Sequence, residues 1–205
     1  MDKRLLPLLP LVAKPARYTN QELNAQHKKW DEIAIKVALA FPDIYDVGMG
    51  HLGFKILYGL INGRQDALAE RVYAPWIDLE ALMKKNDIPL TSLESGAELS
   101  AFDLVGFTLQ YELSYSNILR ILDLANIPRR SADRTESDPL IMAGGPCAFN
   151  VEPIADFLDF VVLGEGEEVI QEILDVVKEA KEEGLFREEL LVKLAQIQGI
   201  YVPEF

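Results

Sequence analysis

The residues best suited to chemistry gather in one glycine-rich segment, Asp46-Val-Gly-Met-Gly-His-Leu-Gly53. Its glycines, Gly48, Gly50 and Gly53, would let the backbone approach a ligand closely, and a helix that begins here would offer free N–H groups. They match the G-x-G-x-x-G spacing of dinucleotide-binding turns, but no acidic residue lies cleanly after the second expected strand. His51 leaves two interpretations open, because a histidine in such a turn can contact or ligate a cofactor or can cap the following helix.

Three later segments carry glycine or polar residues at or directly after the end of an expected strand. Their candidate ligand-binding residues are Thr108, Gln110, Gly144, Gly145, Gly164, Glu165 and Gly166. The paired glycines could form a ledge against which a ligand lies. Glutamates in the first turn of a helix ordinarily complement the helix dipole, which explains Glu167 and Glu168 better than it explains Glu165.

Several kinds of site are excluded by composition. Cys147 is the single cysteine, so the chain holds no intrachain disulfide, no zinc site of paired cysteines and no iron–sulfur cluster bound by three or four of its own cysteines. No basic residue near Cys147 in the sequence would activate its thiol, so we expect a small packing residue. With only His27 and His51 available, we find no nucleophile–base–carboxylate triad, and no phosphate-binding G-x-x-x-x-G-K-[ST] motif is present.

Charge is distributed unevenly along the 205 residues, whose formal net charge is −13. Residues 1–30 carry six Lys or Arg against two acidic residues, a net +4, which leaves −17 for the remainder. Phosphate contacts need clustered cations, so nucleic acid is not an expected partner. No stretch approaches the ~18–20 apolar residues of a membrane span, and prolines interrupt the short apolar run near the N-terminus, so we expect a cytoplasmic protein without a membrane partner.

The elements that must position these residues alternate between strand and helix. A nearly continuous apolar run at 33–41 is typical of a strand buried on both faces. The expected strands are 33–41, 69–73, 89–93, 104–109, 140–143 and 160–163. The expected helices are 51–62, 77–85, 112–125, 167–182 and 185–196. This alternation predicts an α/β fold, a doubly wound and mostly parallel sheet with helices on both faces.

Ligands of such sheets bind outside the carboxyl ends of the strands, which is where the glycine-rich and polar segments fall. We therefore expect all the candidate residues to meet at one edge of the sheet. The expected organisation has three parts: an irregular basic arm with some helix near 20–30 (1–32), the α/β domain (33–183), and C-terminal helix and linker (184–205).

Four segments occur in order along the chain: Leu52-Gly-Phe-Lys-Ile-Leu-Tyr58, Asp103-Leu-Val-Gly-Phe-Thr108, Pro139-Leu-Ile-Met-Ala-Gly-Gly-Pro146 and Asp159-Phe-Val-Val-Leu-Gly-Glu-Gly-Glu-Glu168. Together they resemble the N-terminal cobalamin-binding-like domain that precedes the catalytic barrel in many radical SAM enzymes, here an uncharacterised subgroup. The resemblance implies a flavodoxin-like sheet whose carboxyl-end rim faces the barrel, with residues 184–205 leading toward that barrel.

The resemblance also implies a function and a cofactor. The chain would be an accessory corrinoid-binding domain, not catalytic in isolation, that holds cobalamin against the barrel of a larger iron–sulfur enzyme. The [4Fe–4S] cluster and S-adenosylmethionine would belong to that barrel, because their CxxxCxxC motif is absent here. The residues implied to bind the corrinoid are Gly48, Gly50, His51, Gly53, Thr108, Gln110, Gly144, Gly145, Gly164, Glu165 and Gly166.

In the wider family the loop after the first strand carries D-x-H-x-x-G, whose histidine can ligate cobalt from below. His51 is the corresponding candidate metal ligand in this chain. Met49 stands where that motif has its aspartate, and Phe54 where it has its glycine. Thr108 occupies the place of a serine that lies beside the nucleotide tail of the cofactor.

Two alternatives remain at this point. A degenerate scaffold of the same ancestry would bind no cofactor and serve as a docking or substrate-recognition module; large side chains filling the groove above Gly144 would favour it. A response-regulator-like signalling domain would need an acidic cluster with a facing lysine. Asp43 and Asp46 are available for that cluster, but no lysine follows the expected strand at 140–143.

Overall fold

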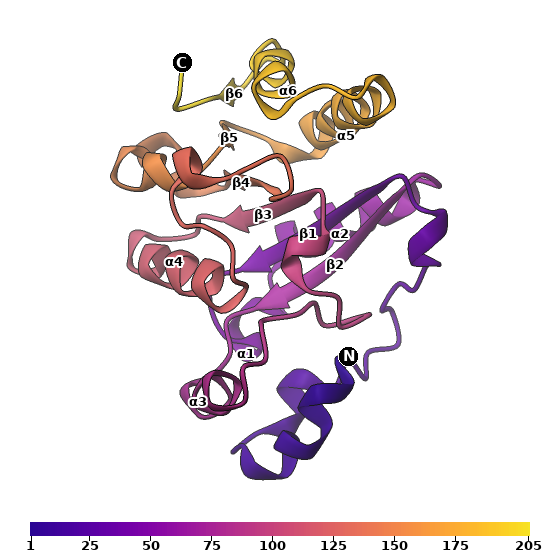
Figure 1. Cartoon of the computed structure of the whole chain (residues 1–205), viewed down its shortest axis with the longest axis vertical. Helices are drawn as coiled ribbons and strands as arrows, with labels where there is room; N and C mark the ends of the chain where they lie inside the picture. Colours follow the sequence, from indigo (N-terminus) through magenta and orange to yellow (C-terminus); the bar gives the residue numbers. More distant parts are fainter.

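A computed structural model describes all residues, 1–205, and its centre is a six-stranded sheet in the order β2-β1-β3-β4-β5-β6 (Figure 1). The strands are β1 (Ile35–Phe41), β2 (Ala67–Tyr73), β3 (Leu104–Thr108), β4 (Leu140–Gly144), β5 (Phe160–Val162) and β6 (Ile200–Tyr201). The first five are parallel, and β6 runs antiparallel to β5. The expected doubly wound α/β fold is confirmed, and the order 2-1-3-4-5 is that of flavodoxin-like sheets.

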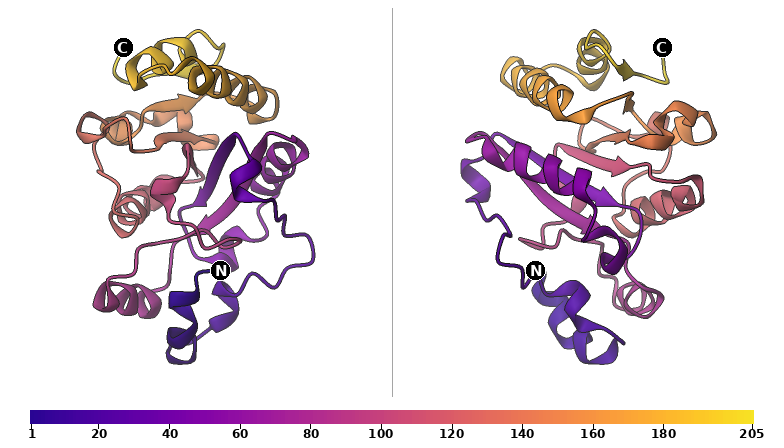
Figure 2. Two further views of the ribbon diagram at one scale, coloured as in Figure 1. Left: turned by 45° about the vertical axis from the view of Figure 1, so that its right-hand side comes forward. Right: turned by 180° about the vertical axis from the view of Figure 1, so that it is seen from behind.

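Helices cover both faces of this sheet. The α-helices are α1 (Tyr45–Gly48), α2 (Leu52–Gly63), α3 (Ile77–Asn86), α4 (Tyr115–Leu124), α5 (Gly166–Glu183) and α6 (Arg187–Leu194). Apolar side chains of α2, α5 and α6 pack in one core cluster, and those of α3 and α4 pack in the other. Figure 1 views the sheet with α2 behind it, and the reverse view in Figure 2 brings α2 to the front. No helix is long and apolar enough to span a membrane.

Short 3-10 helices make up much of the remaining chain. They are η1 (Lys3–Leu11), η2 (Pro15–Tyr18), η3 (Trp30–Glu32), η4 (Leu99–Ala101), η5 (Glu112–Ser114), η6 (Ser131–Asp133), η7 (Pro146–Asn150) and η8 (Glu152–Phe157). The helix expected near 20–30 is not formed, and the nine-residue η1 was not anticipated because it contains Pro7 and Pro10. A 3-10 turn tolerates these prolines better than a long α-helix would.

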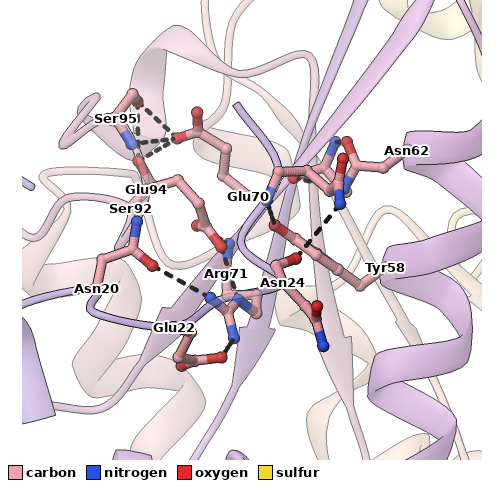
Figure 3. Close-up of polar contacts among 12 residues, drawn as sticks. Asn20, Glu22, Asn24, Tyr58, Asn62, Glu70, Arg71, Ser92, Glu94 and Ser95 are labelled. Carbon is pink, nitrogen blue, oxygen red and sulfur yellow. Dashed lines mark hydrogen bonds and ion pairs between the residues drawn. The ribbon is translucent and has the colours of Figure 1, made fainter. Parts of the chain in front are cut away.

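The N-terminal segment 1–32, called the arm below, packs closely on the sheet domain. Its side chains Leu5, Leu8 and Val12 are buried in the same cluster as α3 and α4. At the edge strand β2, the buried Arg71 guanidinium donates to Glu94 at 2.6 Å and to Glu22 of the arm at 2.5 Å, as Figure 3 shows. The arm is therefore tied to the edge strand β2 through the Arg71 side chain.

The strand expected at 89–93 is wrong. That segment runs beside β2 as a loop with a single isolated bridge, Thr91 to Glu98. The Leu93 amide donates to the Arg71 carbonyl at 2.8 Å, but the Arg71 amide donates to the Glu94 carboxylate at 2.7 Å. Because a side chain takes the backbone donor that a ladder would need, no strand forms.

Candidate functional site

A cavity of about 470 Å³ opens at the carboxyl ends of β1, β3 and β4, between α2 and α5. It lies where the chain reverses direction in the sheet, since β1 leads to β2 on one side and β3 leads to β4 and β5 on the other. This topological switch point is the usual ligand position in open α/β sheets. The volume is within the range of about 300–1,000 Å³ that is typical of small-molecule sites.

Nine of the eleven residues proposed from the sequence line this cavity: His51, Gly53, Thr108, Gln110, Gly144, Gly145, Gly164, Glu165 and Gly166. The other two do not. Gly48 packs against the core, where an added Cβ would lie 2.7 Å from Phe41 and Tyr73, and Gly50 faces open space. Gly48 is thus a packing glycine of the α1 turn, while the other nine candidates line one cavity at the carboxyl edge of the sheet.

Sequence reasoning missed the apolar floor of the cavity. Strand register places Leu39, Gly106 and Met142 in one row across β1, β3 and β4, and all three line the cavity. Gly106 makes room for the Met142 side chain on this floor, because a Cβ at position 106 would meet the Met142 methyl group at 2.6 Å. The glycine inside the strand 104–109 was the available signal, since a glycine in a strand interior often marks close approach.

The rim of the cavity is made of backbone and uncharged polar groups together with carboxylates. Gly145 has φ of +119° and Gly164 has φ of +105°, conformations that favour glycine. A Cβ on Gly145 would also lie 3.1 Å from the Leu109 carbonyl oxygen. The Thr108 hydroxyl accepts a hydrogen bond from the Gln110 amide. No lysine or arginine lines the cavity, so it offers no cation to a phosphate.

His51 sits at the start of α2, on the cavity wall. Its Nδ1 accepts a hydrogen bond from the Phe54 amide at 3.2 Å, so the imidazole caps the helix. The ring also packs on Phe41, with 5.5 Å between ring centroids. Nowhere in the chain do three or more His, Cys, Asp or Glu side chains form a cluster that could hold a metal ion.

Cys147 directly follows the cavity-lining Pro146 in the sequence, but its own side chain does not line the cavity. Burial and the neighbouring Glu112 carboxylate raise its pKa, which keeps the group protonated at neutral pH. This agrees with the expectation of an unactivated thiol.

Large apolar side chains are exposed beside the cavity residues, on the segments that follow β1, β3 and β4. They are Val47, Met49, Leu52, Tyr111, Leu113 and Phe149. Leu113 is 85% exposed and Phe149 is 78% exposed, and Phe149 also lines the cavity. Exposed apolar groups gathered at one edge typically mark a surface that another protein part or a ligand covers.

Comparison with known proteins gives three matches. Residues 53–203 match the family model described as "Radical SAM proteins, N-terminal". "Uncharacterized protein MJ0966" of Methanocaldococcus jannaschii is 24% identical over 153 residues, which are 73% of this chain and 28% of that protein. The chain therefore spans little more than a quarter of the length of this relative.

A solved structure also matches, at 16% identity and a TM-score of 0.45, over 82% of this chain and 27% of that one. It is the radical S-adenosylmethionine methyltransferase TsrM from Kitasatospora setae, with cobalamin and a [4Fe-4S] cluster bound. At this level of similarity the match adds nothing to the geometry described above. The family model, in contrast, covers most of the chain, and the chain belongs to the family of N-terminal domains of radical SAM proteins.

Proposed function

We propose that this chain is the accessory cofactor-binding domain of a larger radical SAM protein and that its cavity receives part of a corrinoid. The observation that carries the proposal is the open, glycine-edged cavity of about 470 Å³ at the switch point of a sheet in this family. A bound corrinoid would supply a cobalt centre for methyl transfer or radical rearrangement.

The cavity fits one part of a corrinoid better than the whole. A corrin macrocycle with its nucleotide loop is far larger than a drug-sized ligand, for which about 300–1,000 Å³ suffices. The apolar floor of Leu39, Gly106 and Met142 and the neighbouring Phe54, with no lysine or arginine on the walls, suit a flat uncharged heterocycle. The nucleotide base would therefore enter the cavity, and the macrocycle would lie across its rim.

The rim has the features that such a macrocycle needs. Gly144, Gly145 and Gly164 leave backbone uncovered by side chains, so a flat ligand can approach closely. Thr108 and Gln110 supply a hydroxyl and an amide that are already hydrogen-bonded to each other and can orient a polar edge of the ligand. Glu165 would meet amide donors at the ligand periphery, which is the role we assign to it.

The rest of the protein would be the partner of this domain. The exposed apolar side chains around the cavity mouth support contact with a catalytic barrel in the same polypeptide, and the relative that extends far beyond the match is consistent with this. The [4Fe–4S] cluster and S-adenosylmethionine would belong to that barrel, since this chain has one cysteine.

The scaffold alternative is disfavoured by the cavity itself. A degenerate domain was expected to fill the groove above Gly144 with large side chains, whereas an added Cβ there would meet only Val162 atoms, the nearest at 3.4 Å. The signalling alternative needs free carboxylates, but Asp43 accepts from the Tyr111 hydroxyl at 2.9 Å and Asp46 pairs with Lys14 and Arg17.

The test is to titrate the purified chain with hydroxocobalamin and, separately, with cobinamide, which lacks the nucleotide tail. We expect a co-eluting corrinoid spectrum with hydroxocobalamin and much weaker binding of cobinamide. Gly144→Leu should abolish binding by filling the cavity, whereas Gly59→Leu, on an open surface of α2, should not. Absence of bound corrinoid at high micromolar concentration would refute the proposal.

A further inference from the structure

We infer that residues 19–29 of the arm, called the strap below, open and close as one unit with α1 and the start of α2, the segment that carries one wall of the cavity. Glu22 is the positioning residue that holds this unit closed. The strap lies outside residues 53–203, the part of the chain that matches the family model, and it lines no part of the cavity. The effect of a bound ligand on the strap rests on the proposed function, whereas the shared opening does not.

The strap is hydrogen-bonded along the length of α1 and α2. Three bonds follow one another in the order of the sequence: the Glu22 carboxylate accepts from the Tyr45 hydroxyl at 2.7 Å, the Gln26 amide donates to the Tyr58 hydroxyl at 2.7 Å, and the Lys28 ammonium donates to the Arg64 carbonyl at 2.6 Å. The strap has no helix or strand of its own. Figure 3 shows Glu22 and Tyr58 at this junction. The strap therefore holds the segment at its start, its middle and its end.

Polar contacts, with little apolar burial, keep the strap in place. Leu23 is its one large apolar side chain and is fully exposed, and no residue of the strap is buried. The preceding helix η1, in contrast, buries Leu5 and Leu8 in the core. Segments with few buried apolar contacts open at a lower free energy than the core does. The strap is therefore built to release while η1 stays attached.

A series of aromatic contacts connects the strap to the cavity. Neighbouring rings in the series have centroids 5.2 to 5.8 Å apart, and their order is Tyr45, Tyr73, Phe54, Phe41 and His51. Phe54 and His51 line the cavity. The α1 backbone lies directly on these rings, because a Cβ on Gly48 would be 2.7 Å from both Phe41 and Tyr73. Close-packed groups transmit displacement to their neighbours, so release of Tyr45 by the strap loosens the rings behind the cavity wall.

Glu22 is the residue whose removal tests this coupling, because its carboxylate joins the strap to α1 and, through Arg71 at 2.5 Å, to β2. Arg71 also donates to the buried Glu94 carboxylate at 2.6 Å. Glu22→Ala therefore leaves no unpaired buried cation, and the variant should fold. Glu32, in the same arm, forms an exposed ion pair with Lys29 and provides the matched control.

Native-state hydrogen exchange of the intact chain in low urea, followed by NMR, tests the shared opening. The Gln26 amide reports on the strap, and the hydrogen-bonded amides of Gly48 and Met49 report on α1. We expect all three to exchange through one opening, at a lower free energy than the amides of β3 and β4. Glu22→Ala should accelerate all three by the same factor, about tenfold or more for the loss of a hydrogen bond to a charged group, and Glu32→Ala should not. Acceleration at Gln26 alone, or exchange of all three only together with β3 and β4, would overturn the inference.

Hydroxocobalamin provides the reciprocal measurement, because coupling between two sites acts equally in both directions. A ligand on the closed wall should slow exchange at Gln26, which lies outside the cavity, by about fivefold or more. This slowing should be lost in Tyr45→Phe, which breaks the contact between the strap and the rings. An unchanged Gln26 rate with ligand bound would overturn the coupling and leave the proposed function standing. If the chain binds no corrinoid, the proposed function fails, and the exchange rates without ligand still decide whether the strap and the wall open together.

Discussion

Asp159 lies at the amino-terminal edge of the sheet, where its carboxylate binds several segments together. Replacing this carboxylate by a neutral side chain should strongly lower the free energy of unfolding. Its side chain is fully buried and accepts hydrogen bonds from Arg134 at 2.8 Å, Arg187 at 2.7 Å, the Ser131 hydroxyl at 2.6 Å and the Ile141 amide at 2.6 Å. Asp159→Asn keeps the shape but removes the charge and turns an N–H₂ group toward these donors.

The size of this destabilisation follows from the burial of Arg134, the ion-pair partner of Asp159. The Arg134 side chain is also 0% exposed, and burial lowers its pKa, so Asp159 is the charge that compensates it. Removing one partner of such a pair costs about 3–5 kcal/mol, because the other charge remains buried. Asp156, paired with Arg130 at 70% and 59% exposure, is the matched control, for which about 1 kcal/mol or less is expected.

Urea unfolding monitored by circular dichroism measures this difference. With an m value of about 2–3 kcal/mol per molar urea, Asp159→Asn should lower the midpoint by about 1–2.5 M. Asp156→Asn should lower it by less than about 0.5 M by the same conversion. If the two variants unfold at the same urea concentration, the reasoning about burial is refuted.

Two further changes test the loop geometry and the pH dependence. Gly145→Ala places a Cβ on a residue with φ of +119°, 3.1 Å from the Leu109 carbonyl oxygen, and should lower the free energy of unfolding in urea by about 1–3 kcal/mol. The control Gly59→Ala, in α2, should be neutral or stabilising. Equal effects of the two substitutions would contradict a strained position at Gly145. Burial and the Glu22 carboxylate, which accepts from the phenol at 2.7 Å, raise the pKa of Tyr45 to about 12. The folded chain therefore holds this proton above the ordinary tyrosine pKa of about 10, so stability should fall as pH rises from about 10 to about 12. Tyr45→Phe should make thermal unfolding less dependent on pH in that window, and an unchanged slope would count against the contact.

The sheet was predictable because its central strands carry a strong local signal. The runs at 33–41 and 104–109 are apolar except for Lys36 and Thr108, which is typical of strands buried on both faces. The glycines after β4 and β5 marked the rim for an equally local reason, since glycine is required where φ is positive. Such features depend on the residue itself and its immediate neighbours.

The features that were missed depend on contacts between distant residues. Strand register brings Leu39, Gly106 and Met142 into one row on the cavity floor, and register is a property of strand pairs that one strand does not encode. The segment 89–93 has a strand-like pattern, but the carboxylate of Glu94 occupies the Arg71 amide. The segment 20–30 forms no helix because its polar groups bond to α2 and β2 instead. Its Gln26 amide donates to the Tyr58 hydroxyl of α2 at 2.7 Å, and its Glu22 carboxylate accepts from Arg71 of β2.

The charge distribution acquires a different meaning once the arm is placed. In the sequence, residues 1–30 are set apart by a net charge of +4 against −17 for the remainder. In the structure, Lys14 and Arg17 pair with Asp46 in α1, and the Glu22 carboxylate of the arm accepts from both Tyr45 and Arg71. The arm thus holds in place the segment that leads from β1 to His51.

This attachment bears on the proposed function. Tyr45 packs on Tyr73, with 5.2 Å between ring centroids, and Tyr73 packs in turn on Phe54, which lines the cavity. The wall of the cavity is therefore braced by the arm through a continuous set of contacts, while the segments after β3 and β4 present the exposed apolar side chains Leu113 and Phe149. A ligand seated here would be rigidly supported from the sheet and left open toward the barrel. That asymmetry is what a domain needs if it holds a cofactor whose reactive face is used by another part of the protein.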